Sequence, residues 1–403
     1  MSDFLSEGLG PSQKGEARGP RRSERKSRGS KIDHTGTGAD SITDTGAGTA
    51  AGTDTAADLC DPVVGMAFVI RPAELADLER LESLIAQVQA GITSLAIDRD
   101  TLRQKIETSA ASFAAEIHGA GSEDYFFVLA DDDVQKVAGM CAVRAAVGLK
   151  DPFYSYRIGT VVHASKELNV HRAHPALYLS NDYTGCTELT SLFLSPAHRG
   201  KGLGTLLSKS RLLFIAEFPA RFADKVIAEI RGVSDDEGRS PFWNGLGQHF
   251  FSMDFPTADH LVGTGHKSFI AELMPKHAIY VLFLPEDARE AIGKPHPNSK
   301  KALEMLEGEG FRYETYVDIF DGGPTVECRR NDIHAVRASR RRTARIGALE
   351  NPVRCLLANT KLQDFRCSIG NARLDGADGV TLDPEMARAI RIKEGDLVRV
   401  LEL

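Results

Sequence analysis

One stretch of the chain places an apolar strand, a glycine-rich turn and a helix in direct succession. In LTSLFLSPAHRGKGLGTLL, residues 189–207, the strand stops at Pro196, and leucines at helical spacing begin after residue 202. The segment RGKGLG, residues 199–204, joins the two. The first N–H groups of a helix lack internal acceptors, and the helix dipole adds positive charge there. The stretch therefore predicts a strand–turn–helix unit whose turn binds an anion.

The residue types in this turn favour a pyrophosphate as the anion. Glycine has no Cβ, so the backbone at Gly202 and Gly204 can approach phosphate oxygens closely. Arg199 and Lys201 add positive charge. The residues expected to bind the phosphates are Arg199, Gly200, Lys201, Gly202 and Gly204.

Two common phosphate loops do not match this turn. A Walker A loop requires GxxxxGK[ST], and a dinucleotide fingerprint requires GxGxxG after the first strand. Here the glycines occupy 200, 202 and 204, in the fourth strand–helix step. The spacing R-x-x-G-x-G instead resembles the acyl-CoA pyrophosphate loop of GNAT-type acyltransferases. A tight turn before a packed helix is the structural alternative, and the later FWNGLGQHFF, similar to that superfamily's helix and LGF element, favours the acyl-CoA interpretation.

Composition excludes several other classes of protein. The 403 residues carry 49 Lys and Arg against 56 Asp and Glu, a net charge of −7, which argues against a nucleic-acid coat protein. Six cysteines without a CxxC pair argue against a disulfide scaffold or a structural zinc site. No apolar run approaches the roughly 18 residues of a membrane span, and the N-terminus has no secretory h-region. We expect a cytoplasmic protein.

The first 65 residues differ from everything that follows. They are rich in Gly, Ser, Thr, Ala and Asp, with a basic block at residues 14–31 and an acidic block at 33–61. Such a segment cannot bury enough apolar surface to offset its ordering entropy. We expect a disordered low-complexity tail, or a start codon assigned upstream of Met66.

The folded sequence after Met66 alternates strands and helices around one predicted sheet. The expected order is a strand at 67–73, helices at 73–89 and 98–108, and two strands joined by an acidic turn at 131–133. A less regular insert at 149–186 precedes the strand, glycine turn and helix described above. A strand at 225–232, a short helix and an aromatic strand after Gly247 complete this part.

The remaining sequence predicts two smaller parts. Strands at 268–275 and 279–285, a helix at 299–310 and a strand at 311–322 form the first. Its helix–glycine–aromatic–strand plan repeats that of FWNGLGQHFF, which is either a weak internal repeat or ordinary glycine capping. An Arg-rich connector and short strands follow. We expect units at 1–65, 66–255, 256–335 and 336–403, the last a small β-rich subdomain.

Several long blocks of the sequence resemble the arginine N-succinyltransferase family. They are DPFYSYRIGTVVHASKELNV, LSNDYTGCTELTSLFLSP, RGVSDDEGRSPFWNGLG, FFSMDFPTADHLVGTGHKSFIAELMPKHAIY and DIFDGGPTVEC. The resemblance covers residues 66–403 and is weaker from about 338. It implies an α/β (α+β) protein with a GNAT-like fold: a mixed central sheet, a second GNAT-like region and a small C-terminal β subdomain.

The resemblance also implies a reaction and two site residues. It implies transfer of succinyl from succinyl-CoA to the α-amino group of L-arginine in arginine catabolism, with no metal and no permanently bound cofactor. The family's acyl-CoA contact is the last Leu of an E-L-x-x-L strand, here Leu192. Its proton-donor histidine lies in a His-Pro pair, here His296. A histidine suits this role because its pKa lies near 6.5.

Other candidates follow from the chemistry of the substrates. Pantetheine pairs with the exposed edge of the fourth GNAT strand, so Leu192 and Leu194 are expected backbone contacts. Carboxylates suit the guanidinium, and cations suit the carboxylates of arginine and succinate. The expected carboxylates are Glu188, Asp182, Glu229 and Asp254, the expected cations are Arg231, Arg157 and Lys166, and His163 is a second catalytic candidate.

Three alternatives remain open at this stage. The enzyme could prefer ornithine, or it could be one subunit of a two-subunit succinyltransferase. A non-catalytic, CoA-binding regulatory module is the third, and the presence of both the glycine loop and His296 argues against it. The expected partners are L-arginine and succinyl-CoA, not nucleic acid or membrane. We expect a homo-oligomer or a pairing with a paralogous subunit.

Overall fold

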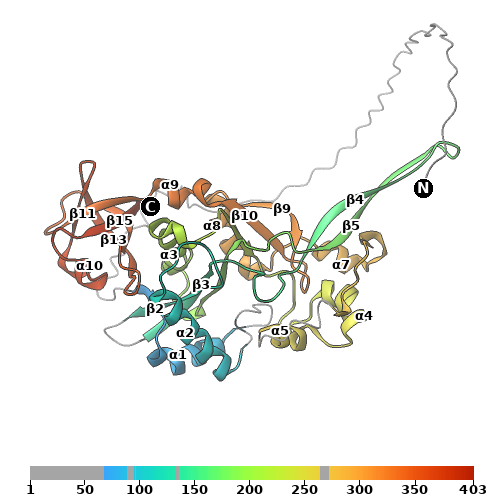
Figure 1. Ribbon diagram of the computed structural model, residues 1–403, viewed down its shortest axis with the longest axis horizontal. Coiled ribbons are helices and arrows are strands. Elements are labelled where there is room, and N and C mark those ends of the chain that lie inside the picture. The colour runs from blue at the N-terminus through green and yellow to red at the C-terminus, as the bar shows by residue number, and fades with distance from the viewer. Residues whose placement is uncertain (1–67, 89–94, 96, 132–135, 264–271) are drawn as a thin grey trace, which may run out of the picture. The chain divides into compact units, whose positions relative to one another are not determined.

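The computed structural model describes residues 68–88, 95, 97–131, 136–263 and 272–403, so the predicted tail lies outside the described residues. Fifteen described strands join in one sheet, in the order β12-β15-β11-β14-β13-β1-β2-β3-β6-β7-β10-β9-β4-β5-β8 (Figure 1). The first ten are β1 (Val69–Pro72), β2 (Asp124–Asp131), β3 (Lys136–Arg144), β4 (Ser155–Ser165), β5 (Val170–Ser180), β6 (Thr187–Leu194), β7 (Lys225–Glu229), β8 (Ile279–Tyr280), β9 (Arg312–Val317) and β10 (Pro324–Arg329). The others are β11 (Arg340–Ile346), β12 (Val353–Asn359), β13 (Cys367–Asp375), β14 (Gly379–Leu382) and β15 (Leu397–Glu402).

Helices cover both faces of the centre of this sheet. They are α1 (Leu78–Ile85), α2 (Arg99–Ala114), α3 (Leu203–Glu217), α4 (Gln248–Phe251), α5 (Phe255–Gly263), α7 (Glu286–Ala291), α8 (Lys300–Gly308), α9 (His334–Ala338) and α10 (Pro384–Ala389). Successive side chains of a strand point to opposite faces of the sheet. Almost every residue of strand β2 is buried, so both of its faces are covered. Phe126 packs in the cluster of α1 and α2, whereas Phe127 packs in the cluster of α3. A mixed sheet with helices on both faces confirms the predicted α/β class.

The helix α3 is the centre of the larger core. Its leucines 206, 207 and 213 and Phe214 are buried, as the sequence pattern predicts. Phe214 contacts the aromatic rings of Phe113, Tyr125, Phe127 and Phe365 at centroid distances of 5.0–5.7 Å. The helix that follows the glycine-rich loop is therefore held rigidly against the sheet.

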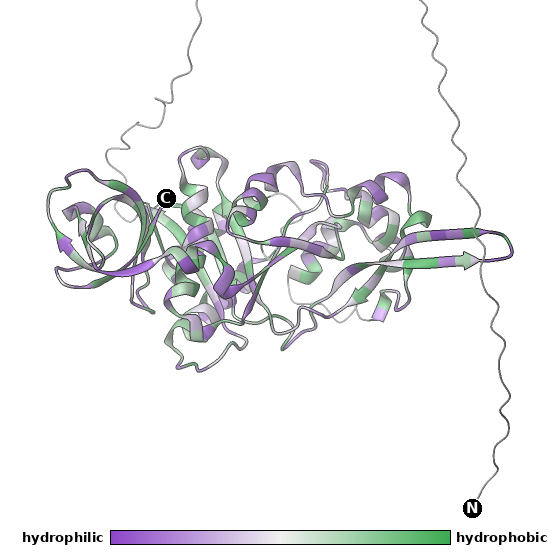
Figure 2. Cartoon of the chain, turned by 90° about the horizontal axis from the view of Figure 1, so that it is seen from above, coloured by the Kyte–Doolittle hydropathy of each residue, from purple (hydrophilic) through white to green (hydrophobic). Residues whose placement is uncertain are grey.

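The predicted helix at 98–108 and the predicted strands around it have mixed outcomes. The helix forms as α2, with Asp98 as its N-cap accepting a hydrogen bond of 2.8 Å from the Thr101 N–H, but it runs on to Ala114. Strands β2 and β3 are confirmed, and the turn between them lies partly outside the described residues. The insert at 149–186 is more regular than predicted, because β4 and β5 pair over eleven residues each. Hydrophobic and hydrophilic residues alternate along this ribbon, which extends away from the other described strands (Figure 2).

The predicted aromatic strand after Gly247 is wrong. Residues 243–247 form a π-helical turn that continues into α4, so Gly247 lies inside a helical segment. A Cβ on Gly247 would lie 2.3 Å from the Trp243 ring, so close packing requires glycine here. At the second supposed repeat, Gly310 has φ +100°, α8 has ended, and strand β9 follows. The two segments therefore have different structures, and the internal repeat is not supported.

The remaining predictions concern the C-terminal half. The helix at 299–310 and the strand at 311–322 correspond to α8 and β9, while the strand at 279–285 shortens to β8 and a 3₁₀ turn. Half of the predicted strand at 268–275 lies outside the described residues, and the described half is not a strand, because residues 272–273 are helical. Strands β11 to β15 and α10 surround their own apolar cluster. The unit boundaries at 255 and 335 stay predictions. No helix in the described ranges is long and apolar enough to cross a membrane.

Candidate active site

Strands β6 and β7 separate and leave a cavity between them. They pair in parallel at only two positions, Thr187 with Val226 and Glu188 with Ile227. Beyond that point β6 continues to Leu194, whereas β7 ends at Glu229. A cavity of about 450 Å³ lies beside this fork, lined by residues 188–192 of β6 and 228–231 at the end of β7. Backbone groups of a strand that has lost its neighbour are available to a ligand.

A β-bulge in β6 shapes the cavity wall. Met140 pairs with Phe193 and Ala142 with Thr190, so two residues, Ser191 and Leu192, lie opposite Cys141. Ser191 has φ +54°, and its hydroxyl accepts a hydrogen bond of 2.9 Å from Lys105 Nζ. A bulge changes the direction in which the following side chain and peptide point. The side chains of both expected acyl-CoA contacts, Leu192 and Leu194, pack against the main core, and Leu192 also lines the cavity.

The glycine-rich loop has the conformation that its sequence predicts. Gly200 and Gly202 have φ +84° and +74°, and Gly202 is the N-cap of α3. Around Gly204 no atom lies within 4 Å of an added Cβ, so this position faces open space. Arg199 and Lys201 are exposed, and the Arg354 guanidinium from β12 approaches the loop. Arg354 is a further cation at this loop that sequence reasoning missed, because it lies 152 positions away from Gly202.

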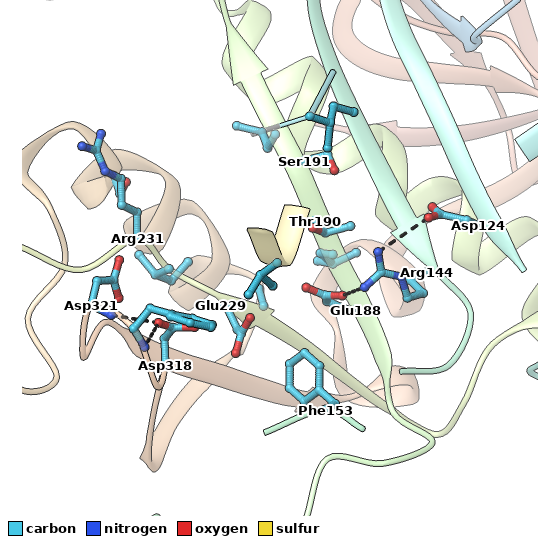
Figure 3. A pocket seen from close by; sticks show the side chains of 18 of the residues that line it. Asp124, Arg144, Phe153, Glu188, Thr190, Ser191, Glu229, Arg231, Asp318 and Asp321 are labelled. Carbon is cyan, nitrogen blue, oxygen red and sulfur yellow. Dashed lines mark hydrogen bonds and ion pairs between the residues drawn. The ribbon is translucent and has the colours of Figure 1, made fainter. Parts of the chain in front are cut away.

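One wall of the cavity carries a cluster of carboxylates around an arginine (Figure 3). Arg144 makes ion pairs of 3.0 Å with Glu188 and 3.7 Å with Asp124. Burial opposes the charge of Arg144, but Glu188, Asp124 and Glu229 outweigh this effect and raise the pKa of the guanidinium. Three carboxylates surround one guanidinium, so this wall carries net negative charge and suits a cationic ligand.

A second acidic group closes the fork near β9. Asp321 accepts hydrogen bonds from the N–H groups of Gly232 and Gly323, at 2.6 and 2.8 Å. Asp318 accepts from the N–H groups of Phe320 and Asp321. Burial raises the pKa of both aspartates. The Asp318 and Asp259 carboxylates raise the pKa of Asp321 further, and Asp259 also raises that of Asp318. Both residues line the cavity, as Arg231 does, and the Arg231 side chain extends away from the two carboxyl groups (Figure 3).

His296 lies immediately behind this wall. Its N–H donates to the carbonyl of Arg231 at 2.8 Å, and Nδ1 accepts from the Asn298 N–H at 3.1 Å. Nδ1 as acceptor assigns the proton of the neutral ring to Nε2. Burial lowers the pKa of His296, and the Arg231 guanidinium lowers it further. His296 itself is not among the residues that line the cavity, but Arg231 and Ser299 on either side of it are.

The sequence-predicted residues divide into two groups. Glu188, Leu192, Glu229 and Arg231 come together at the cavity. The others lie elsewhere: Asp182 accepts from Tyr316 Oη at 2.8 Å, Asp254 caps the start of α5, and Arg157, His163 and Lys166 belong to the β4–β5 ribbon. Sequence reasoning missed Lys105, Arg144, Asp318 and Arg211 in the wall. They come from four different elements, and no local pattern connects them.

Known protein families and known proteins match this chain over most of its length. A family model described as arginine N-succinyltransferase beta subunit matches residues 68–335, and the model of its C-terminal domain matches 340–402. The arginine N-succinyltransferase of Escherichia coli (strain 55989 / EAEC) is 49% identical over 338 residues, which cover 83% of this chain and 97% of that protein. The enzyme of the same name from Salmonella typhi is 48% identical, with the same coverage of both chains.

A solved structure is also similar to this chain. It is that of arginine/ornithine succinyltransferase subunit AI from Pseudomonas aeruginosa, which is 40% identical and superposes with a TM-score of 0.78. The match covers 84% of this chain and 99% of the other. Because two family models span the described chain and relatives nearly half identical match over almost their whole length, this protein belongs to the arginine N-succinyltransferase family.

Proposed function

We propose that this protein transfers the succinyl group of succinyl-CoA to the α-amino group of L-arginine. The observation that carries the proposal is the fork between β6 and β7, with a cavity at its mouth and the glycine-rich loop at the far end of β6. The names and coverage of its relatives support the same reaction.

The donor would lie along β6. Its pyrophosphate fits the N-terminus of α3, where Arg199, Lys201 and Arg354 supply positive charge. Its pantetheine arm fits the unpaired edge of β6, which carries the thioester to Leu192 at the bulge. The N–H groups near the bulge can stabilise the oxyanion of the tetrahedral intermediate.

The acceptor would lie against the acidic wall. Glu188, Glu229 and Asp124 surround Arg144 there, and their excess negative charge suits the guanidinium of L-arginine. Its α-ammonium group first loses a proton to solvent, because only the neutral amine is a nucleophile. The amine nitrogen then attacks the thioester carbonyl, the new C–N bond forms, and the C–S bond breaks.

His296 would handle the second proton of the amine. Its Nε2–H is the donor for the departing CoA sulfur, and the ring recovers a proton from the attacking nitrogen. The products are N-succinylarginine and CoA thiol, so protons and bonds balance. The family resemblance supports this role. His296 does not itself line the cavity, although its neighbours Arg231 and Ser299 do.

The test is thiol release from acyl-CoA by the purified protein. L-Arginine and L-ornithine are compared as acceptors, and succinyl-CoA and acetyl-CoA as donors, with a control lacking acceptor. Release that requires both succinyl-CoA and arginine supports the proposal. Release with ornithine instead would favour the second candidate, an ornithine-preferring enzyme. Ornithine is included because the similar Pseudomonas aeruginosa protein is named an arginine/ornithine succinyltransferase. CoA binding without turnover would favour a missing paralogous subunit.

A further inference from the structure

Arg211 is a buried cation that the reaction described above does not use. It lies on α3, two turns beyond the start of the helix, and is 3% exposed. Its described hydrogen bond runs from Nε to the carbonyl of Ser208 at 3.4 Å, near the limit of such a bond. Within the described residues, neither terminal nitrogen of this guanidinium has a hydrogen-bond partner, and no carboxylate lies within ion-pair distance.

Other buried arginines of the chain show how unusual this is. Arg221 donates to two carbonyls and to Tyr125 Oη, and Arg399 pairs with Glu217 at 2.6 Å. Removing a guanidinium from water without a partner is unfavourable, so buried arginines are normally satisfied in this way. Burial accordingly lowers the pKa of Arg211, although the group stays protonated. The terminal nitrogens of Arg211 are not among the fully buried atoms that lack a partner, so these donors open to the cavity and are available to a ligand.

The cavity shows where such a ligand would be. Arg211 and Ser208 both line it, one helical turn apart on the same face of α3. The hydroxyl of Ser208 also has no hydrogen-bond partner among the described residues. Apolar side chains also line this cavity, among them Leu192 at the bulge, Ile230, Ala302 and Leu306. Leu192 is the expected position of the thioester, so the donors of Arg211 and Ser208 lie in the same cavity as whatever extends beyond the thioester carbonyl.

We propose that Arg211, together with Ser208, binds the distal carboxylate of the succinyl group and thereby selects dicarboxylic acyl-CoA donors over neutral ones. The inference rests on the proposed function and adds its donor specificity. An acetyl group would leave the guanidinium unsatisfied, whereas succinyl places a carboxylate two methylene groups beyond the thioester. A planar guanidinium can bind a carboxylate through two hydrogen bonds.

The other cations of the wall fit different tasks. Arg144 is paired with Glu188 and Asp124, and Arg231 lies beside Asp321 and Asp259. Of the three arginines in the described wall, Arg211 is thus the one with no carboxylate beside it, whereas Arg144 and Arg231 each lie beside acidic side chains. An anionic acyl group and a cationic amino acid would therefore each meet a surface of opposite charge.

The test measures binding without an acceptor, by calorimetry with CoA, butyryl-CoA and succinyl-CoA. Butyryl has the same chain length as succinyl but ends in a methyl group. We expect the wild-type protein to bind succinyl-CoA at least about tenfold more tightly than butyryl-CoA. Arg211→Met should abolish this preference and leave the affinities for CoA and butyryl-CoA within about twofold. Arg221→Met is the matched control, a buried arginine whose loss should keep the preference.

Thermal unfolding of the unliganded protein separates binding from structure. Because the partnerless charge of Arg211 is removed, Arg211→Met should melt at the same temperature as the wild type or higher, whereas Arg221→Met should melt lower. If Arg211→Met is insoluble, Arg211→Lys and Ser208→Ala replace it, and each should reduce the preference in part. A role of Arg211 in packing alone would lower the melting temperature and leave the preference intact.

Two outcomes would overturn the assignment. The first is a retained preference for succinyl-CoA in Arg211→Met; if the KM for arginine is raised at the same time, the guanidinium belongs to the acceptor's carboxylate. The second is an equal loss of affinity for all three CoA compounds, which would place Arg211 on the pantetheine arm. A wild type that transfers acetyl but not succinyl would refute the proposed function itself, whereas normal succinyl transfer by Arg211→Met refutes only this inference.

Discussion

The main-chain N–H of His296 donates a hydrogen bond of 2.8 Å to the carbonyl of Arg231. An isolated bridge between Gly232 and Pro295 continues the contact. These bonds attach the segment that carries His296 to the end of β7, although His296 lies 65 positions after Arg231 in the sequence. The histidine is therefore held at the mouth of the fork by backbone geometry.

His296→Ala should lower kcat by about 10² to 10⁴, the usual contribution of a general acid or base. The dissociation constant for succinyl-CoA should stay the same, because the substitution removes no part of the proposed donor site. His163→Ala is the control. His163 lies on the β4–β5 ribbon and is not among the residues that line the cavity, and its Nε2 is 3.1 Å from Tyr280 Oη. Steady-state thiol release measures both. A change in kcat of less than about twofold for His296→Ala would remove it from the reaction.

The lowered pKa of His296 predicts a pH dependence. Burial and Arg231 place its folded pKa below the unfolded value of about 6.5. As pH falls, the unfolded chain therefore binds the proton first, so the contribution of His296 to stability is complete above about pH 6.5 and lost as pH falls through the folded pKa. Arg231→Gln should shift the acid limb of kcat/KM to higher pH. Arg289→Gln, an exposed control, should not, and an unmoved limb in Arg231→Gln contradicts the electrostatic coupling.

Gly202 and Gly204 should respond differently to alanine. Gly202 has φ +74°, so Gly202→Ala should destabilise the fold by about 1 kcal/mol as well as weaken CoA binding. Gly204 lies in the first turn of α3 beside open space, so Gly204→Ala should stabilise the helix by up to about 1 kcal/mol. It should nevertheless weaken CoA binding, because its methyl group occupies the space for the phosphates. Urea unfolding and calorimetry test the pair, and unaltered CoA affinity in both variants would exclude the loop from the donor site.

Glu229→Gln should raise the KM for arginine by about tenfold, equivalent to about 1.4 kcal/mol of binding. The reason is that Glu229 belongs to the acidic wall of the cavity. Asp182→Asn is the control, since Asp182 is exposed and accepts from Tyr316 Oη outside the wall. Initial rates at saturating succinyl-CoA distinguish the two. Equal effects of both substitutions would argue against recognition of the guanidinium by this wall.

Glu217 joins α3 to the C-terminal strands and should be important for stability. Its buried carboxylate pairs with Arg399 on β15 at 2.6 Å and with Arg341 on β11 at 2.8 Å. Glu217→Ala leaves the buried Arg399 guanidinium without its partner and should cost about 3 kcal/mol in urea unfolding. The pair with Arg341 adds little, because that side chain is half exposed. Glu237→Ala, at an exposed position, should change stability by less than about 0.5 kcal/mol.

Much of the fold and one part of the site are local properties of the sequence. The glycine-rich loop needs two residues with positive φ between a strand and a helix, and Gly200 and Gly202 meet this requirement wherever the helix packs. The capping of α2 by Asp98 is equally local. The prediction of an aromatic strand after Gly247 was wrong. A glycine that ends a helix and a glycine that leaves room for a neighbouring aromatic ring look identical in sequence. Only the position of Trp243 shows which one applies.

The amino-acid sequence by itself determined the α/β class, the helix and strand around the loop, and the resemblance to a succinyltransferase family. These features depend on periodicity and on residues within a few positions of one another. The tertiary structure decided which charges share a cavity. Arg144, Glu229, Asp318 and Arg211 come from a strand, a second strand, a loop and a helix, and they meet only where β6 and β7 separate. The burial of Arg211 and the absence of a carboxylate partner for it among the described residues are properties of packing between distant segments, which no local pattern in the sequence encodes.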